Sequence, residues 1–361
     1  MPFSTALPAV AIVGAAPSPE LASAANLALY SAMAVFTIAM LLYTAYLAAL
    51  GPVSRAGQAG ERAKELVAVG ADATGASSGS SGSGGVVGGA DGAAAAVDAD
   101  DADDAAVAGP SLRARKLAGS AYGMTCLATL VLVGSVVLRG LAVMRPPWGN
   151  MFEFATAGAT AAAVAYCLLA RRNRWEWLGL FVVGPVLLTL GTALLAFYTE
   201  AAELMPALKS VWLIIHVTVA ILAVGVFVLG FSVGVVYLVK SRREATTPDR
   251  RTFWETLPSA ASLERTAYGL NMVGFILWTF TLVAGAIWAQ KAWGSYWTWD
   301  PKEVWTFVVW VVYAAYMHAR ATAGWEPRKA MWIAIAGFMT VVVNFAVVNV
   351  YFVGQHSYSG L

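Results

Sequence analysis

The chain has 361 residues, of which 59% are hydrophobic and only 12% are charged, and its mean hydropathy is +0.67. Soluble globular proteins carry about 45–50% apolar and about 25% charged residues, so this composition excludes an ordinary soluble enzyme, a nucleic-acid-binding protein and a disordered protein. The formal net charge of +2 implies no strong field that would attract nucleic acid or acidic substrates.

Eight segments are long and apolar enough to cross a bilayer, which requires about 20 mostly apolar residues. They cover residues 25–50, 118–144, 153–170, 175–198, 211–239, 267–290, 303–321 and 331–353. The first twenty residues lack the basic region of a signal peptide, so we expect 1–24 to be an uncleaved tail. Residues 71–110 are dominated by Gly, Ser, Ala and Asp, without aromatic residues, Lys or Arg. This composition predicts a disordered insert within a longer loop at 51–117.

The Lys and Arg residues are divided unequally between the two ends of the predicted spans. Of the 23, 18 fall in the loops after the first, third, fifth and seventh spans, four fall on the opposite side, and Arg139 lies within the second span. Loops rich in Lys and Arg stay in the cytoplasm, so both termini are expected outside it. The loops 145–152, 199–210 and 291–302 and the tail 354–361 then face outward. We predict an all-α polytopic membrane helix bundle with about eight transmembrane helices, whose functional core is the seven-helix region 118–353.

Three histidines are candidates for function, because ionisable residues within a membrane bundle are costly. His216 lies near the outer end of the fifth predicted span, and His356 directly follows the last span. His318 lies near the cytoplasmic end of the seventh span. Each also has a structural interpretation. His356 would reach lipid headgroups, His216 would join two helices by a hydrogen bond, and His318 would snorkel beside Arg320.

A tryptophan-rich segment, AQKAWGSYWTWDPKEVW, lies on the outer loop between the two outer histidines. An interfacial aromatic belt would explain single Trp residues at a membrane boundary. The density of Trp here, together with the loop positions Gly294 and Pro301, instead favours a flat aromatic platform that binds a ligand. Heme fits such a platform, because neutral His nitrogens from both sides can fill its axial positions. Asp300 and Glu303 are expected to orient the loop or to cap the seventh span.

The motif WGSYWTWD at 293–300 is similar to the WGxxWxWD signature of the heme-handling, tryptophan-rich WWD-domain superfamily, which includes CcmC, CcmF and CcsA/ResC. Eight spans, a motif between the sixth and seventh, and a His after the last span resemble the CcsA/ResC type of the System II pathway, because CcmF-type proteins are longer and CcmC-type proteins shorter. A second match, PPWGNMFEF at 146–154, resembles the P-x-x-N-x-[YF]-E element of this type. The insert at 71–110 departs from the compact family form.

The resemblance implies a set of site residues. His216 and His356 would be the axial ligands of heme iron at the outer face, and His318 would belong to an inner site with a second ligand from a partner. The expected heme pocket comprises Trp293, Gly294, Tyr296, Trp297, Trp299 and Asp300. Asn150, Glu153 and Glu303 are expected to support this pocket.

The resemblance also implies a membrane subunit of a System II cytochrome c synthase in the plasma (cytoplasmic) membrane. Heme b would be its bound cargo, presented at the outer face for thioether attachment to the CxxCH motif of apocytochrome c. A ResB-type membrane subunit would supply the missing inner ligand and share a holocytochrome c synthase (heme lyase) activity. A thioredoxin-like thiol reductase would keep the apocytochrome thiols reduced. No nucleic-acid partner is expected.

Two other functions stay open on the sequence alone. A bis-His b-type electron-transfer protein would need paired histidines at one depth of the bundle, whereas the third His has no partner and the tryptophan-rich loop would have no purpose. A heme exporter without ligation chemistry would use the same binding residues. A ResB-like and a thioredoxin-like gene beside this one would favour synthesis over export.

Overall fold

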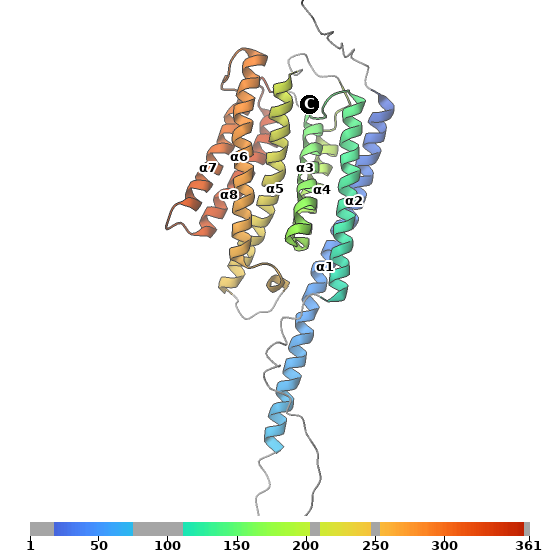
Figure 1. The fold of residues 1–361 in the computed structure, drawn as a ribbon, viewed down its shortest axis with the longest axis vertical. Coiled ribbons are helices and arrows are strands. Elements are labelled where there is room, and N and C mark those ends of the chain that lie inside the picture. The colour runs from blue at the N-terminus through green and yellow to red at the C-terminus, as the bar shows by residue number, and fades with distance from the viewer. Residues whose placement is uncertain (1–17, 75–110, 203–209, 247–252, 357–361) are drawn as a thin grey trace, which may run out of the picture.

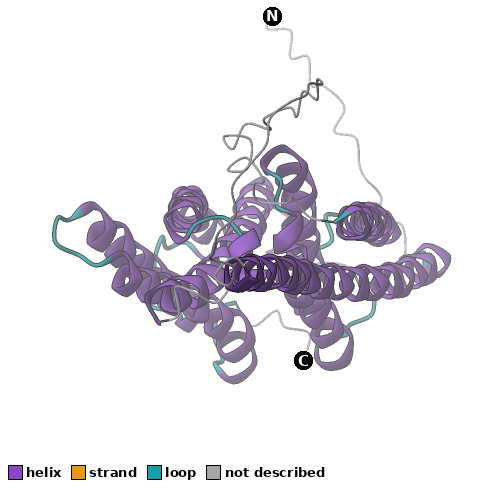
Figure 2. Ribbon diagram, turned by 90° about the horizontal axis from the view of Figure 1, so that it is seen from below, coloured by secondary structure: helices purple, strands orange, loops and turns teal. Residues whose placement is uncertain are grey.

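The structure is a computed structural model that describes residues 18–74, 111–202, 210–246 and 253–356, with the backbone alone for 51–74, 253 and 255. These residues form a bundle of helices, without a strand in the described part of the chain (Figure 1). Viewed from below, some helices are seen end-on and the others obliquely, so they run along the long axis of the molecule with different tilts (Figure 2). The predicted all-α bundle is confirmed.

Eight long helices follow one another along the described chain. They are α1 (Pro19–Thr74), α2 (Leu112–Ala142), α3 (Met151–Asn173), α4 (Gly179–Ala196), α5 (Val211–Thr246), α6 (Ala260–Trp293), α7 (Pro301–Ala321) and α8 (Pro327–Val342). Short 3-10 turns, η2 (Glu176–Leu178) and η4 (Phe253–Thr256), precede α4 and α6. A π-helical segment, η5 (Val343–Val348), continues α8 into α9 (Asn349–Tyr351). Every predicted span falls on one of these helices.

Seven of the described helices are long and apolar enough to cross a membrane, and α7 is the long helix outside this set. Its Trp, Tyr and His residues and the charges at its two ends, from Lys302 to Arg320, lower its hydropathy. It nevertheless packs against α6 and α8 as part of the bundle (Figure 1). The helix expected at 303–321 is therefore present, although its composition is amphipathic.

The first helix differs from the sequence expectation. It continues to Thr74 instead of ending at residue 50, and α2 begins at Leu112 instead of 118, so the expected loop 51–117 is shorter. Hydropathy marks only the apolar part of a helix, whereas the Ala, Glu, Lys and Arg residues of 53–74 are strong helix formers that prolong it. The expected insert 71–110 thus begins with four helical residues, and its remainder lies outside the described residues.

A buried ion cluster fixes the loop between α2 and α3. The Glu153 carboxylate, which is fully buried, accepts hydrogen bonds from Arg139 Nε at 3.1 Å, Arg145 Nη1 at 2.7 Å and Gly149 N at 2.8 Å. Asn150 caps α3 by accepting from Glu153 N at 2.8 Å. Removing one partner of a buried ion pair is strongly destabilising, so this cluster holds the loop in one position. The residues 148–151 of this loop form one wall of the cavity described next.

Candidate functional site

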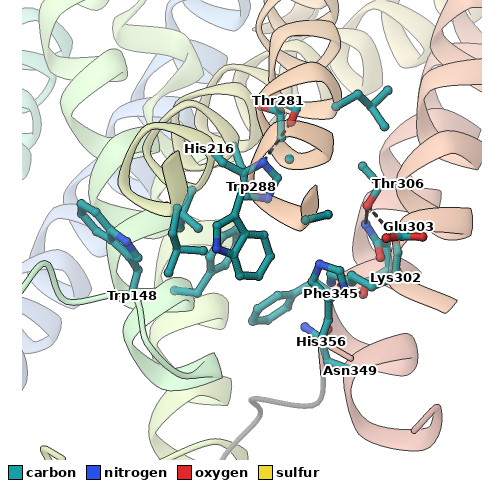
Figure 3. Close-up of a pocket in the computed structure, with 18 of the residues that line it drawn as sticks. Trp148, His216, Thr281, Trp288, Lys302, Glu303, Thr306, Phe345, Asn349 and His356 are labelled. Atoms are coloured by element: carbon teal, nitrogen blue, oxygen red, sulfur yellow. Dashed lines mark hydrogen bonds between the residues drawn. The ribbon is translucent and has the colours of Figure 1, made fainter. Parts of the chain in front are cut away.

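A partly open cavity of about 210 Å³ lies at the end of the bundle where α3, α5 and α7 begin (Figure 3). Its walls come from the loop before α3, the first turns of α5, the second half of α6, the first turns of α7 and the π-helical segment. Most of its surface is apolar. The two histidines expected at the outer face, His216 and His356, line it, although 140 residues separate them in the sequence.

His216 enters the cavity from the second turn of α5. Its Nδ1 lies 2.9 Å from the backbone oxygen of Thr281 on α6. A carbonyl oxygen only accepts, so Nδ1 carries the proton and donates, which leaves Nε2 as the lone-pair nitrogen of the neutral ring. Gly285 makes room for this ring, because a Cβ there would lie 2.7 Å from His216 Cε1.

His356 reaches the same cavity from the chain that follows α9. Its Nδ1 lies 2.9 Å from Oδ2 of Asp300, and the carboxylate accepts this hydrogen bond. The backbone N–H of Gln355 donates to the other carboxylate oxygen. Gly354 allows this close approach, since a Cβ at that position would collide with the Asp300 carboxylate. Asp300 thus holds the terminal segment against the start of α7.

Asp300 also begins α7. Its side chain accepts from the backbone N–H of Lys302 at 3.0 Å, and Glu303 accepts from the backbone N–H groups of Asp300 and Thr298, which completes a capping box. Burial acts to raise the pKa of Asp300, but the hydrogen bonds from His356, Gln355 and Lys302 outweigh it and lower the pKa below its usual value. The carboxylate is therefore ionised at neutral pH. The expected capping and loop-orienting roles of Asp300 and Glu303 are both present.

One aromatic ring packs against both histidines. The Trp288 ring centroid lies 6.1 Å from that of His216, nearly parallel at 15°, and 5.6 Å from that of His356 at 69° (Figure 3). Trp293 packs edge-on against His356 at 4.9 Å. In the described part of the chain, neither histidine Nε2 accepts or donates a hydrogen bond. This pattern, with Nδ1 tied to an oxygen and Nε2 free, is typical of metal-ligating histidines.

The tryptophan-rich loop is not a flat platform. Gly294 ends α6 in the left-handed conformation, with φ of 74°, and Trp299 also has a positive φ of 60°. Trp297 lines the cavity, whereas the Trp299 side chain is 77% exposed and meets Trp297 edge to face at 5.7 Å. Tyr296 lines the rim and is 61% exposed. The rings stand at steep angles because the two helix caps turn the chain sharply between them.

The structure divides the residues predicted for the outer site into two groups. Those that line the cavity are His216, His356, Tyr296, Trp297, Asn150 and Glu303. Trp293, Gly294, Trp299, Asp300 and Glu153 lie behind or beside it, where they contact or position lining residues. The cavity wall thus includes some of the loop residues, and the others contact or position them.

Several lining residues escaped the sequence analysis, and three of them lie at the start of α7 and in the π-helical segment. Lys302 extends its ammonium toward the π-helical segment, and Asn344 and Phe345 of that segment face the cavity. Asn344 carried a usable signal, because a polar amide within an apolar span is as unusual as a histidine there. Nothing in the sequence marks the π-helical turn itself, which depends on packing.

His318 lies apart from this cavity. It is exposed on the surface of α7, with Nε2 3.5 Å from Thr322 Oγ1. Eighteen residues of helix separate it from Asp300, or about 27 Å at 1.5 Å per residue. It therefore belongs to the opposite end of the bundle, where Arg320 pairs with Glu264.

Comparison with known proteins adds an independent finding. Residues 148–356 match the family model described as Cytochrome C assembly protein. The cytochrome c biogenesis protein CcsA of Synechococcus sp. (strain CC9902) is 32% identical over 264 residues, which cover 65% of this chain and 85% of that protein. The CcsA protein of Prochlorococcus marinus (strain MIT 9303) is 33% identical over 262 residues, covering 65% and 82%. That of Guillardia theta is 31% identical over 265 residues, covering 66% and 85%. The matched family region begins at the loop before α3 and ends at His356, so it includes every wall of the cavity.

Proposed function

Because the chain belongs to the Cytochrome C assembly protein family, we propose that its cavity binds heme at the outer membrane face and presents it to apocytochrome c. The chain is a multi-pass membrane protein, and its membership of this family gives it a role in cytochrome c maturation. The observation that carries the proposal is the pair His216 and His356, which line one aromatic cavity with each Nδ1 held by an oxygen.

The residues of the cavity fit heme chemically. The walls are largely apolar, as a porphyrin ring requires, and two imidazole Nε2 atoms are free of protein hydrogen bonds in the described chain. One buried donor of the wall, Trp288 Nε1, also has no partner among the described residues and is available to a carboxylate of the ligand. The cavity is smaller than the roughly 300–1,000 Å³ of sites that enclose a whole ligand. Heme would therefore extend through the open side, where a second protein reaches it.

The chain's own contribution is positioning and control of the axial ligands. His216 and His356 hold the iron, and Asp300 keeps His356 in one tautomer and one orientation. The side chains of Trp288 and Trp297 limit the position of the porphyrin ring. The histidine of an incoming CxxCH motif displaces one of the two protein ligands. Each cysteine S–H then adds across one heme vinyl group, forming a C–S bond while the proton goes to the other vinyl carbon, so no oxidant is needed. A ResB-type subunit completes the synthase, and a thioredoxin-like reductase supplies the free thiols.

An absorption spectrum tests the heme proposal. The protein is purified in detergent, with and without a co-expressed ResB-type partner, and titrated with heme b. Two imidazole ligands are expected to give a low-spin spectrum in both redox states. A purely five-coordinate, high-spin spectrum of the parent protein would contradict the axial pair.

Reporter fusions test the orientation. We expect reporters placed in 60–110 and 241–262 to lie in the cytoplasm, and reporters in 291–302 or after His356 to lie outside. The reason is the bias of 18 basic residues against four, since cationic loops resist translocation. Cysteine accessibility to a membrane-impermeant reagent gives a second readout at the same positions. An external location for 60–110 would reverse the orientation, and the cavity would then open to the cytoplasm.

Substitution of His318 tests the inner site. Heme is made in the cytoplasm, so we propose that it enters near His318, where the exposed imidazole is available to a ligand-bearing partner subunit. His318→Ala is expected to lose most heme from the outer cavity in cells, because delivery precedes docking. His318→Gln keeps a polar group that can bond Thr322 but cannot replace an iron ligand, so it is expected to fail equally. Cytochrome c yield measures both variants, and full assembly by both would leave His318 a structural residue.

A further inference from the structure

One corner of the cavity contains the amine of Lys302, which forms no ion pair with a carboxylate in the described part of the chain. Lys302, in the first turn of α7, lines the cavity, and its Nζ donates to the backbone oxygen of Asn344 at 2.8 Å. An ammonium has three N–H donors, and this is the hydrogen bond that the described residues offer it. The nearby carboxylates are engaged elsewhere: Asp300 with His356 and Gln355, and Glu303 with Thr298. No ion pair joins Lys302 to a carboxylate in the described part of the chain.

The second member of this corner is Asn344 in the π-helical segment. Its side chain is 3% exposed, its Nδ2 lies 3.4 Å from Thr306 Oγ1, and its Oδ1 has no partner among the described residues. Thr306 donates in turn to the backbone oxygen of Lys302 at 2.7 Å, so the start of α7 and the π-helical segment form one connected polar corner. π-Helical turns frequently occur at functional sites. Here the turn presents a backbone oxygen to Lys302 and an amide to the cavity.

A charged amine without a carboxylate partner is costly in a largely apolar cavity, and an anionic group bound beside Lys302 would offset that cost. We propose that Lys302 and Asn344 bind an anionic carboxylate of the ligand, which for heme is a propionate. The inference rests on the proposed function and names the part of heme that this corner recognises. The ammonium supplies charge-assisted hydrogen bonds to the carboxylate, and the Asn344 amide N–H supplies a neutral one. Because propionates and vinyl groups lie on opposite edges of heme, this anchor turns the vinyl edge away from the corner.

The test compares heme b with its dimethyl ester, which keeps the iron and the ring but carries no anionic carboxylate. Both porphyrins are titrated into the detergent-solubilised parent, Lys302→Gln, Lys302→Arg and Lys291→Gln proteins. Lys291 is the matched control, because it lies at the same end of the bundle in the last turn of α6 and its Nζ lies over the Trp212 ring. We expect the parent and Lys291→Gln to bind heme about 10- to 100-fold more tightly than the ester. Lys302→Gln should bind both porphyrins equally, and Lys302→Arg should retain part of the preference.

A second variant covers the case in which Lys302→Gln fails to fold. Asn344→Asp places a protein carboxylate beside Lys302, so the corner is filled from within and an incoming propionate is repelled. Its affinity for heme should fall at least tenfold, while its affinity for the ester stays within threefold of the parent. An unchanged heme preference in Lys302→Gln or Asn344→Asp would overturn the propionate anchor alone. If the parent binds neither porphyrin, the proposed heme function fails instead.

Discussion

Replacement of both His216 and His356 by alanine is expected to abolish the low-spin heme spectrum of the purified protein. Each imidazole offers its Nε2 to the cavity while an oxygen holds Nδ1, so the double variant loses both axial nitrogens. Each single variant keeps one ligand and should show a high-spin, five-coordinate spectrum with faster loss of heme. Added imidazole should return the single variants to the low-spin state, because it fills the vacant axial position.

Thr218→Ala is the matched control for the His216 variant. Thr218 lies on the same helix and is half-buried, and its hydroxyl bonds within α5, to the backbone oxygen of Ile214 at 2.6 Å. Its spectrum and heme affinity should equal those of the parent. If the double histidine variant retains an unchanged low-spin spectrum, the axial assignment is wrong. Cytochrome c yield in cells should fall in parallel with heme retention.

The sequence was sufficient to predict the helices and the end of the bundle at which the site lies. Consecutive helices alternate in direction, so a His at the start of the fifth span and one after the eighth must lie at the same end. Each residue contributes independently to the hydropathy of a span and to the charge of a loop. Both quantities can therefore be obtained from the sequence by simple addition. The same is true of the cap formed by Asp300 and Glu303, which depends on a local three-residue spacing.

The shape of the cavity could not be predicted in this way. The Trp288 ring contacts both histidines because Gly285 admits His216 and Gly354 lets the terminal segment approach Asp300 closely. These fits depend on the rotation and separation of neighbouring helices. Trp299 is a second feature that the sequence could not predict. Its position in the motif suggests that it lines the cavity, but its backbone has a positive φ and its side chain is exposed.

A pair of substitutions at Asp300 is expected to separate its two roles. Asp300→Ala removes both the helix cap and the acceptor for His356, so the protein should lose about 0.5–2 kcal/mol of stability from the cap. Heme affinity should also fall, by about 10- to 100-fold, because the partner that orients a metal-ligating His is lost. Asp300→Asn keeps a good helix cap, so its stability should stay close to that of the parent. The thermal unfolding midpoint without heme and a heme titration measure the two effects.

Asp300→Asn distinguishes the helix-capping role from the His356-orienting role, because an amide has fewer hydrogen-bond acceptors than a carboxylate. The Asp300 carboxylate serves His356 and Lys302 through one oxygen and Gln355 through the other, whereas an amide has a single acceptor oxygen and no charge. Asp300→Asn should therefore lose heme affinity without losing much stability. Ser259→Ala, which removes the N-cap of α6 at the opposite end of the bundle, should show the converse: lower stability and unchanged heme affinity. Parent-like heme affinity in Asp300→Asn would mean that Asp300 acts on the site only as a helix cap, and that His356 is held by its packing against Trp288 and Trp293.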